Sequence, residues 1–404
     1  MTMKKTLLLL AMLGASMSAL AQGVSQYDLN QPIGWASVGG ETTGSSDEEP
    51  VTVTTMSQFV NALKGTAKKT IYVKGEIVFS SRQTVSNGQN KTVYGLPGSA
   101  LVNLTHSDNK SESGILRLSN CKNIIIRNLT FKGAGAYDMD FYDDLTIDDG
   151  SSYIWIDHCD FQDGVDGNLD CNNGSDNISV TWCRFRYLIA PWAGGTGGSD
   201  DHRYSNLWGG DDKSSKDLNH LRTTFANCWW DEGCVERMPR VRFGEVHIVN
   251  CLYSSSVVGN YCIGAGYRAN LYVENCAFTT SRAKSRYWKK YATKSGYTDF
   301  NITITNCLGV SDVQQKSGSI DYFIPSNVYS LTAFDKNEVE AEVSAYAGAT
   351  LSIEENQKYT TGLPSVVNER TLNESLPRYN LSGQRVDNNY KGIVIQGGKK
   401  YLVK

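Results

Sequence analysis

Aspartates crowd one stretch of the chain, and their spacing could build a metal site. Between Asp138 and Asp170 the chain carries Asp144, Asp148, Asp149, Asp157, Asp160, Asp163, Asp166 and Asp170. Asp166 and Asp170 follow Asp144 by 22 and 26 residues, close to the period that the cysteines show. Carboxylates stacked on adjacent coils would repel one another unless a hard cation such as calcium binds between them. A solvated acidic face is the alternative interpretation, and the spacing does not fit an EF-hand loop.

A second group of candidates is the arginine cluster in the segment ERMPRVRFGE. Arg237 and Arg242 lie five positions apart, with Pro239 between them. If the proline bends the chain into the next strand, both guanidinium groups reach one surface, where they can recognise carboxylates or sulfates. The alternative interpretation is a surface charge patch.

The cysteines reveal the elements that would position these groups. Five of the ten follow an asparagine: Cys121, Cys228, Cys251, Cys276 and Cys307. The intervals from Cys159 to Cys183, Cys228 to Cys251 and Cys251 to Cys276 are 24, 23 and 25 residues. A strand that returns with such a period predicts a coil stacked on itself.

In such a solenoid, equivalent cysteines form a buried, unpaired ladder. The asparagines lie at the bends, where they tolerate left-handed dihedrals and bond neighbouring coils. A disulfide involving Cys234 or Cys262, which lie off the repeat phase, stays open. A metal cluster is disfavoured because the sequence has no paired CxxC spacing.

The ends of the predicted solenoid differ from its middle. The segment SQFVNALKG places Phe59, Val60 and Leu63 on one helical face, with Ser57 as N-cap. We expect this helix to cover the first coil. The prediction is an all-β parallel solenoid over residues 22–350, a polar linker over 351–377 and a small β module over 378–404.

The first 21 residues have the pattern of a secretory signal peptide. Lys4 and Lys5 precede a short apolar stretch, and Ala19-Leu20-Ala21 is a small-x-small cleavage pattern. The rest of the chain lacks a run of about 18 apolar residues, so no membrane span is expected. The net charge of −3 gives no indication of nucleic acid binding. We expect a secreted monomer, placed outside the cell, on its surface or in the periplasm.

Three long motifs make the chain resemble a known family. They are IWIDHCDFQDGVDGNLDCNNGSDNISVTWCRF, SDDHRYSNLWGGDD and ERMPRVRFGEVHIVNCLY. The chain resembles the family 1 polysaccharide lyases, the pectate and pectin lyases, from about Val51 to Ala349. The resemblance implies a right-handed parallel β-helix with a substrate groove along one exposed sheet. It also implies calcium-assisted β-elimination of α-1,4-linked polygalacturonate.

The resemblance assigns roles to five positions. Asp144, fourteen residues before the histidine of WIDHC, matches the first calcium-binding aspartate. Asp166 and Asp170 match the acidic pair that completes the site. Arg237 matches the arginine that removes the proton, and Arg242 matches one that grips a galacturonate carboxylate.

One departure from the family concerns substrate binding. Many members carry a lysine before the LxG of the middle motif, whereas no lysine occurs from Leu188 to Gly210. Arg203 is the nearest cation and is expected to substitute for it. Asp157 and His158 of the WIDHC motif are structural in the family, so no catalytic role is assigned to them.

Other functions stay open at the level of sequence. A lyase that prefers partly methylated pectin would need less positive charge. A β-helical polygalacturonase would use two carboxylates and no arginine base, and a pectin-binding adhesin would not cleave at all. The tail from Tyr379 to Lys404 resembles the sorting modules of exported Bacteroidetes-type proteins, the alternative being a hairpin that caps the solenoid.

Overall fold

The computed structural model describes residues 31–40, 42–45, 49–140, 142–352, 378–380, 385–386, 390, 392–396 and 399–403. The predicted signal peptide and most of the predicted linker therefore lie outside the described residues. Two compact units are present, residues 1–358 and 359–404. The domain boundaries that the sequence suggested stay a prediction.

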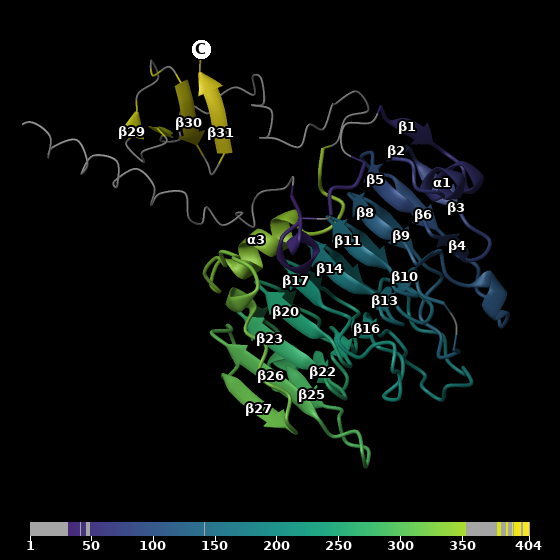
Figure 1. Cartoon of the computed structure of the whole chain (residues 1–404), viewed down its shortest axis with the longest axis vertical. Coiled ribbons are helices and arrows are strands. Elements are labelled where there is room, and N and C mark those ends of the chain that lie inside the picture. Colours follow the sequence, from purple (N-terminus) through teal and green to yellow (C-terminus); the bar gives the residue numbers. More distant parts are fainter. Residues whose placement is uncertain are drawn as a thin grey trace, which may run out of the picture. The chain divides into compact units, whose positions relative to one another are not determined.

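The larger unit is built from three sheets whose strands recur in the same order along the chain (Figure 1). Sheet I contains β1 (Val51–Val53), β2 (Lys69–Val73), β5 (Gln89–Gly95), β8 (Lys122–Arg127), β11 (Ser152–Asp157), β14 (Asp176–Thr181), β17 (Thr223–Ala226), β20 (Glu245–Val249), β23 (Asn270–Glu274), β26 (Phe300–Thr305) and β27 (Val313–Ser317). Its strands pair in parallel except β27, which is antiparallel to β26.

The other two sheets contribute one short strand per coil. Sheet II contains β4 (Gln83–Ser86), β7 (Leu116–Ser119), β10 (Leu145–Asp148), β13 (Leu169–Cys171), β16 (Leu207–Trp208), β19 (Arg240–Val241), β22 (Ile263–Ala265) and β25 (Trp288–Lys290). Sheet III contains β3 (Glu76–Val78), β6 (Ala100–Val102), β9 (Thr130–Lys132), β12 (Asp160–Gln162), β15 (Arg184–Arg186), β18 (Trp229–Trp230), β21 (Leu252–Tyr253) and β24 (Ala277–Phe278). This architecture confirms the predicted right-handed parallel β-helix.

The interior of the coil is filled by ladders of like side chains. On sheet III, Phe131, Phe161 and Phe185 stack with ring centroids 4.7 and 5.3 Å apart. All three are buried. Aromatic ladders of this kind bury large apolar surfaces while keeping one side chain per coil in register.

The cysteines lie where the repeat predicted them. All ten are buried and unpaired. The amide of Cys228 donates to Sγ of Cys251, and that of Cys251 to Sγ of Cys276, each at 3.4 Å. The preceding residues Asn227 and Asn250 have φ of 58° and 50°. The left-handed bend that asparagine tolerates thus sets the position of each thiol.

A helix covers the coil at its N-terminal end. Helix α1 (Met56–Leu63) buries Phe59, Val60 and Leu63 in the core, as predicted. Its N-cap is Thr55, whose side chain accepts from the amide of Gln58. The prediction that Ser57 caps the helix is wrong, because Thr55 two residues earlier already satisfies the first-turn amide.

The C-terminal part of the larger unit also packs against the coil. Two more helices, α2 (Ser281–Ser285) and α3 (Val339–Tyr346), follow in the chain. The main chain of Leu351 exchanges two hydrogen bonds with the side chain of Asn128, at 2.8 and 2.9 Å. None of the described helices is both long and apolar enough to cross a membrane.

The smaller unit contains a sheet of its own. Its strands β28 (Arg378–Asn380), β29 (Arg385–Val386), β30 (Gly392–Gln396) and β31 (Lys399–Val403) pair antiparallel. A role of this unit in sorting stays a prediction.

Candidate active site

Asp170 lies on the outer face of sheet II. In β13 the apolar Leu169 and Cys171 point into the core, so Asp170 between them points outward. Its neighbour on β10 is Thr146, which pairs with it in register. Oδ1 of Asp170 accepts a hydrogen bond from the amide of Leu207 at 2.8 Å, which fixes the carboxylate over the next coil.

Asp143, which the sequence analysis did not single out, is brought beside Asp170. A β-carbon on Gly167 would lie 3.0 Å from Oδ1 of Asp143 and 3.1 Å from Oδ1 of Asp170. Glycine at position 167 therefore leaves the space into which both oxygens point. Oδ2 of Asp143 accepts from the hydroxyl of Thr146 at 2.8 Å.

The pKa values of these carboxylates are raised by burial and by repulsion between neighbouring carboxylates. Burial, followed by repulsion from Asp166, raises the pKa of Asp143 to about 7. Burial, Asp143 and Asp166 raise the pKa of Asp170 well above its usual range. Oδ1 of Asp143 is buried and has no hydrogen-bond partner among the described residues. A bound cation would relieve both the repulsion and the unsatisfied oxygen.

Asp144 is buried next to Asp143, but its side chain points towards Gly133 instead of Gly167. A β-carbon on Gly133 would lie 2.7 Å from Oδ1 of Asp144. Burial and the neighbouring carboxylates of Asp163 and Asp143 raise the pKa of Asp144 well above its usual range. Oδ2 of Asp144, like Oδ1 of Asp143, is buried without a hydrogen-bond partner among the described residues, but it is Asp143 that lies against the space next to Asp170. The role predicted for Asp144 stays a prediction.

A histidine that the sequence analysis missed contacts the acidic group. His202 is buried, with Nδ1 2.7 Å from Oδ1 of Asp138 and Nε2 3.2 Å from Oδ1 of Asp166. Neither ring nitrogen makes a hydrogen bond within the described residues, so His202 lies between the two carboxylates at ion-pair distance. Its only signal in the sequence is its place within the quoted motif SDDHRY.

Arg237 lies next to the acidic group. Its backbone has φ of 57°, a left-handed conformation that is rare outside glycine and is concentrated at functional sites. Its guanidinium carbon lies 4.7 Å from the ring centre of Tyr204. Burial disfavours the charged guanidinium, but Tyr261, Asp170 and Asp166 outweigh it and raise the pKa of Arg237. Arg237 therefore shares one electrostatic environment with the two aspartates.

The two other predicted arginines are held by aspartates. Nε of Arg242 donates to Oδ1 of Asp212 at 2.7 Å, and Nη1 donates to the carbonyl of Gly209 at 2.6 Å. Arg203 makes a bidentate pair with Asp201, with both bonds at 2.7 Å. Part of the positive charge of each is thus compensated within the protein.

The donor chemistry of the acidic group fits a hard divalent cation. Calcium prefers carboxylate oxygens and accepts irregular geometry, and the unpartnered oxygen of Asp143 faces the same space as Asp170. Within the described residues, no three His, Cys, Asp or Glu side chains already surround one metal position. Binding would therefore involve a rearrangement of these side chains or ligands from the substrate.

Comparison with known proteins identifies the family. A family model described as pectate lyase matches residues 6–352, most of the chain. The chain belongs to the pectate lyase family. It is 28% identical over 362 residues to probable pectate lyase B of Aspergillus terreus, a match that covers 85% of this chain and 97% of the relative. It is 28% identical over 330 residues to pectate lyase plyB of Emericella nidulans, covering 79% and 89%.

The fold is likewise shared with solved structures of pectate lyases. A pectate lyase bound to a hexasaccharide superimposes with a TM-score of 0.58 at 20% identity. The match covers 80% of this chain and 97% of that chain. The β-helix is therefore the pectate lyase fold, in agreement with the resemblance in the sequence motifs.

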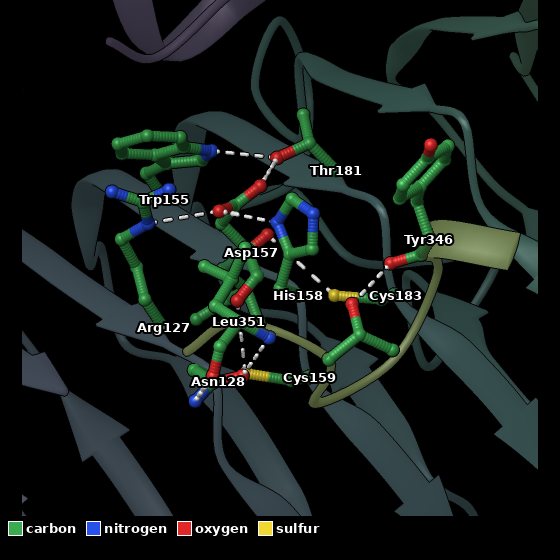
Figure 2. Close-up of polar contacts among 12 residues, drawn as sticks. Arg127, Asn128, Trp155, Asp157, His158, Cys159, Thr181, Cys183, Tyr346 and Leu351 are labelled. Carbon is green, nitrogen blue, oxygen red and sulfur yellow. Dashed lines mark hydrogen bonds and ion pairs between the residues drawn. The ribbon is translucent and has the colours of Figure 1, made fainter. Parts of the chain in front are cut away.

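The Asp–His pair of the WIDHC motif lies apart from this site in the pectate lyase fold. Asp157 ends β11 of sheet I, and its carboxylate contacts Arg127, His158 and Thr181 (Figure 2). Asp157 and His158 are each only 1% exposed. The pair lies out of reach of a polymeric substrate, which agrees with the structural role predicted for it.

Proposed function

We propose that this pectate lyase is secreted and cleaves α-1,4-linked polygalacturonate by calcium-assisted β-elimination. The observation that supports the proposal is that Arg237 lies close enough to Asp170 and Asp166 for their charges to raise its pKa. Two carboxylates alone would fit a hydrolase, whereas a partly buried guanidinium next to a carboxylate cluster can take a proton from an anionic sugar once that cluster is neutralised.

Calcium is the proposed cofactor, held by Asp166, Asp170 and a third carboxylate from the Asp143–Asp144 pair. When bound, the ion would neutralise these carboxylates together with the C6 carboxylate of the uronate, and so favour loss of the C5 proton. The chain's own contribution is to aim the carboxylates. The Leu207 amide holds Asp170 by a hydrogen bond, and Nε2 of His202 lies 3.2 Å from Asp166.

Arg237 is the proposed base. Its neutral form takes the C5 proton, the C5–H electron pair becomes the C4–C5 double bond, and the C4–O4 bond breaks. The leaving oxygen takes up a proton from water. Because Asp170 and Asp166 help to keep Arg237 charged, neutralising these carboxylates lowers the energy needed to form the neutral base. We expect the rate to rise from neutral to alkaline pH.

Arg242 and Arg203 are the proposed contacts to substrate carboxylates. To bind a uronate carboxylate, Arg242 would give up part of its ion pair with Asp212, and Arg203 part of its ion pair with Asp201. A preference for partly methylated pectin is the second candidate function, because the segment Leu188–Gly210 has no lysine and Arg203 is already paired.

The test of the proposed function is the class of product. Polygalacturonate and methylated pectin are incubated with the protein, with calcium or with a chelator, and ultraviolet absorbance of the C4–C5 double bond is followed. We expect unsaturated product that disappears on chelation and returns with added calcium. New reducing ends without unsaturation would indicate a hydrolase, and binding without cleavage an adhesin.

The affinity for calcium should depend on pH. The pKa of Asp143 is raised to about 7 and that of Asp170 lies well above its usual range, so calcium binding must displace protons. Affinity should therefore increase as the pH rises through about 7, as measured by calorimetry in buffers with different ionisation enthalpies. Binding with no release of protons would contradict the assigned carboxylates.

A matched pair of variants tests which of the two neighbouring aspartates, Asp143 or Asp144, binds calcium. We expect Asp143→Asn to weaken calcium binding by about tenfold or more, because it removes an oxygen that faces the same space as Asp170. Asp144→Asn is the comparison, as the family resemblance assigns the ligand to that position. Calcium titration of both variants decides between them, and the larger loss identifies the ligand.

A further inference from the structure

The outer face of sheet II continues beyond the acidic group as a column of residues in register. The column contains Thr146, Asp170, Leu207, Arg240, Gly264 and Lys289. Neighbouring strands lie about 4.8 Å apart, so Arg240 is about 10 Å and Lys289 about 19 Å from Asp170 along the column. A polymer lying along this column would pass over both cations.

The side chain of Arg240 lies along the column. A β-carbon on Gly264 would lie only 3.0 Å from Cγ of Arg240, so glycine at this position leaves room for the arginine. The guanidinium carbon reaches to 4.3 Å from the ring centre of Tyr291, which follows β25 in the chain. Arg240 thus extends away from Asp170 and towards the strand that carries Lys289.

Lys289 approaches the same ring. Its Nζ lies 5.5 Å from the ring centre of Tyr291 and donates to Oδ1 of Asn260 at 2.8 Å. Nδ2 of Asn260 donates to the hydroxyl of Tyr291 at 3.1 Å. Two cations from strands two coils apart are therefore gathered around one tyrosine, within reach of a single anionic group.

This cluster is positively charged. Nε of Arg240 is buried and has no hydrogen-bond partner among the described residues. Burial, with the nearby guanidinium groups of Arg242 and Arg237, lowers the pKa of Arg240. One carboxylate, Glu236, lies close to Arg237, Lys289 and Arg240. Arg237 is already next to Asp170 and Asp166, so Glu236 leaves one of the two charges of Arg240 and Lys289 unbalanced, and an arriving anion would be stabilised here.

We propose that Arg240, Lys289 and Tyr291 form a second substrate subsite, which binds the carboxylate of a uronic acid residue two to four coils beyond Asp170. The inference rests on the proposed function and deepens it. With a net charge of −3, the protein as a whole does not attract a polyanion, so local cations must hold the chain. The subsite supplies positive charge in addition to Arg203, in a chain whose segment Leu188–Gly210 lacks the lysine that the family often has.

The test compares Arg240→Gln and Lys289→Ala with a matched control, Lys290→Ala. Lys290 is the next residue of β25 and equally exposed, but its Nζ lies over Phe300, at 5.1 Å, instead of Tyr291. We expect the first two variants to raise KM for polygalacturonate about tenfold with little change in kcat. On highly methylated pectin, whose esters carry no charge, the increase in KM should be below about twofold. For Lys290→Ala the increase in KM should be below about twofold on either substrate.

A second measurement tests substrate binding at the subsite in the absence of catalysis. Retardation of each variant in gels that contain polygalacturonate is measured without calcium, so that no cleavage is needed. If wild type binds but forms no unsaturated product, the proposed function fails, and weaker retardation of Arg240→Gln still supports the subsite. If wild type cleaves while Arg240→Gln and Lys289→Ala behave like Lys290→Ala in both measurements, the subsite is refuted.

Discussion

Replacement of Arg237 by alanine should lower kcat on polygalacturonate by about 100- to 10,000-fold, the usual contribution of a positioned base. Arg237 is the arginine whose charge is coupled to Asp166 and Asp170, so its loss removes the group closest to the proposed reaction. Initial rates of double-bond formation at saturating calcium measure the effect. Calcium affinity should be retained or increased, because a positive charge near the carboxylates is lost.

Two further variants test whether Arg237 acts as the base or only through its positive charge. Arg237→Lys keeps the positive charge and should recover only a small part of the rate, because a lysine ammonium does not reproduce the guanidinium geometry. Arg117→Gln is the control, since Arg117 lies in β7 of sheet II and pairs with Asp148 and Asp149 at 2.6 Å. Retention of more than a tenth of the wild-type kcat by Arg237→Ala would reject arginine as the base.

Sequence predicted the fold because its signal is local and repeated. Each Asn–Cys pair specifies a left-handed bend followed by an inward side chain, and the interval between pairs gives the length of a coil. Asn227–Cys228 and Asn250–Cys251 illustrate both features. The bonds between Asn128 and Leu351 were not predicted, because they join positions 223 residues apart with no repeat to align them.

The site was predicted less completely because side-chain direction at a bend does not follow from spacing. Asp143 and Asp144 are adjacent in sequence, and only the backbone path into β10 decides which one faces Asp170. His202 was missed because its role depends on two carboxylates 64 and 36 residues earlier. Partners such as Asp212 for Arg242 were hidden for the same reason.

The Asp157 network is a buried charge cluster whose stability depends on all its members (Figure 2). Nε of Arg127 donates to Oδ2 of Asp157 at 2.8 Å, and Nδ1 of His158 lies 2.7 Å from the same oxygen. Burial alone would raise the pKa of Asp157, but His158 and Arg127 outweigh it and hold the pKa below its usual value. The carboxylate therefore stabilises the fold above about pH 4, and this contribution is lost as the pH falls through the lower folded-state pKa.

We expect Asp157→Ala to reduce the free energy of unfolding by about 3–5 kcal/mol, because Arg127 would remain buried without its counter-ion. Chemical denaturation at neutral pH measures the loss. Asp157→Asn, which keeps the shape of the side chain, should destabilise the protein less and keep the variant measurable if alanine prevents folding. The loss for both variants should shrink at acidic pH, where wild type has also lost this contribution.

The control for this prediction is an ion pair on the surface. Asp140 pairs with Lys110 at 3.0 Å, but the side chain of Asp140 is 99% exposed. Exposed pairs contribute at most about 1 kcal/mol, so Asp140→Ala should leave the denaturation midpoint nearly unchanged. The variant Arg127→Met/Asp157→Leu replaces both charges with apolar groups and should regain part of the loss. If Asp157→Ala is as stable as Asp140→Ala, the network contributes no net stability, and the WIDHC pair needs another explanation.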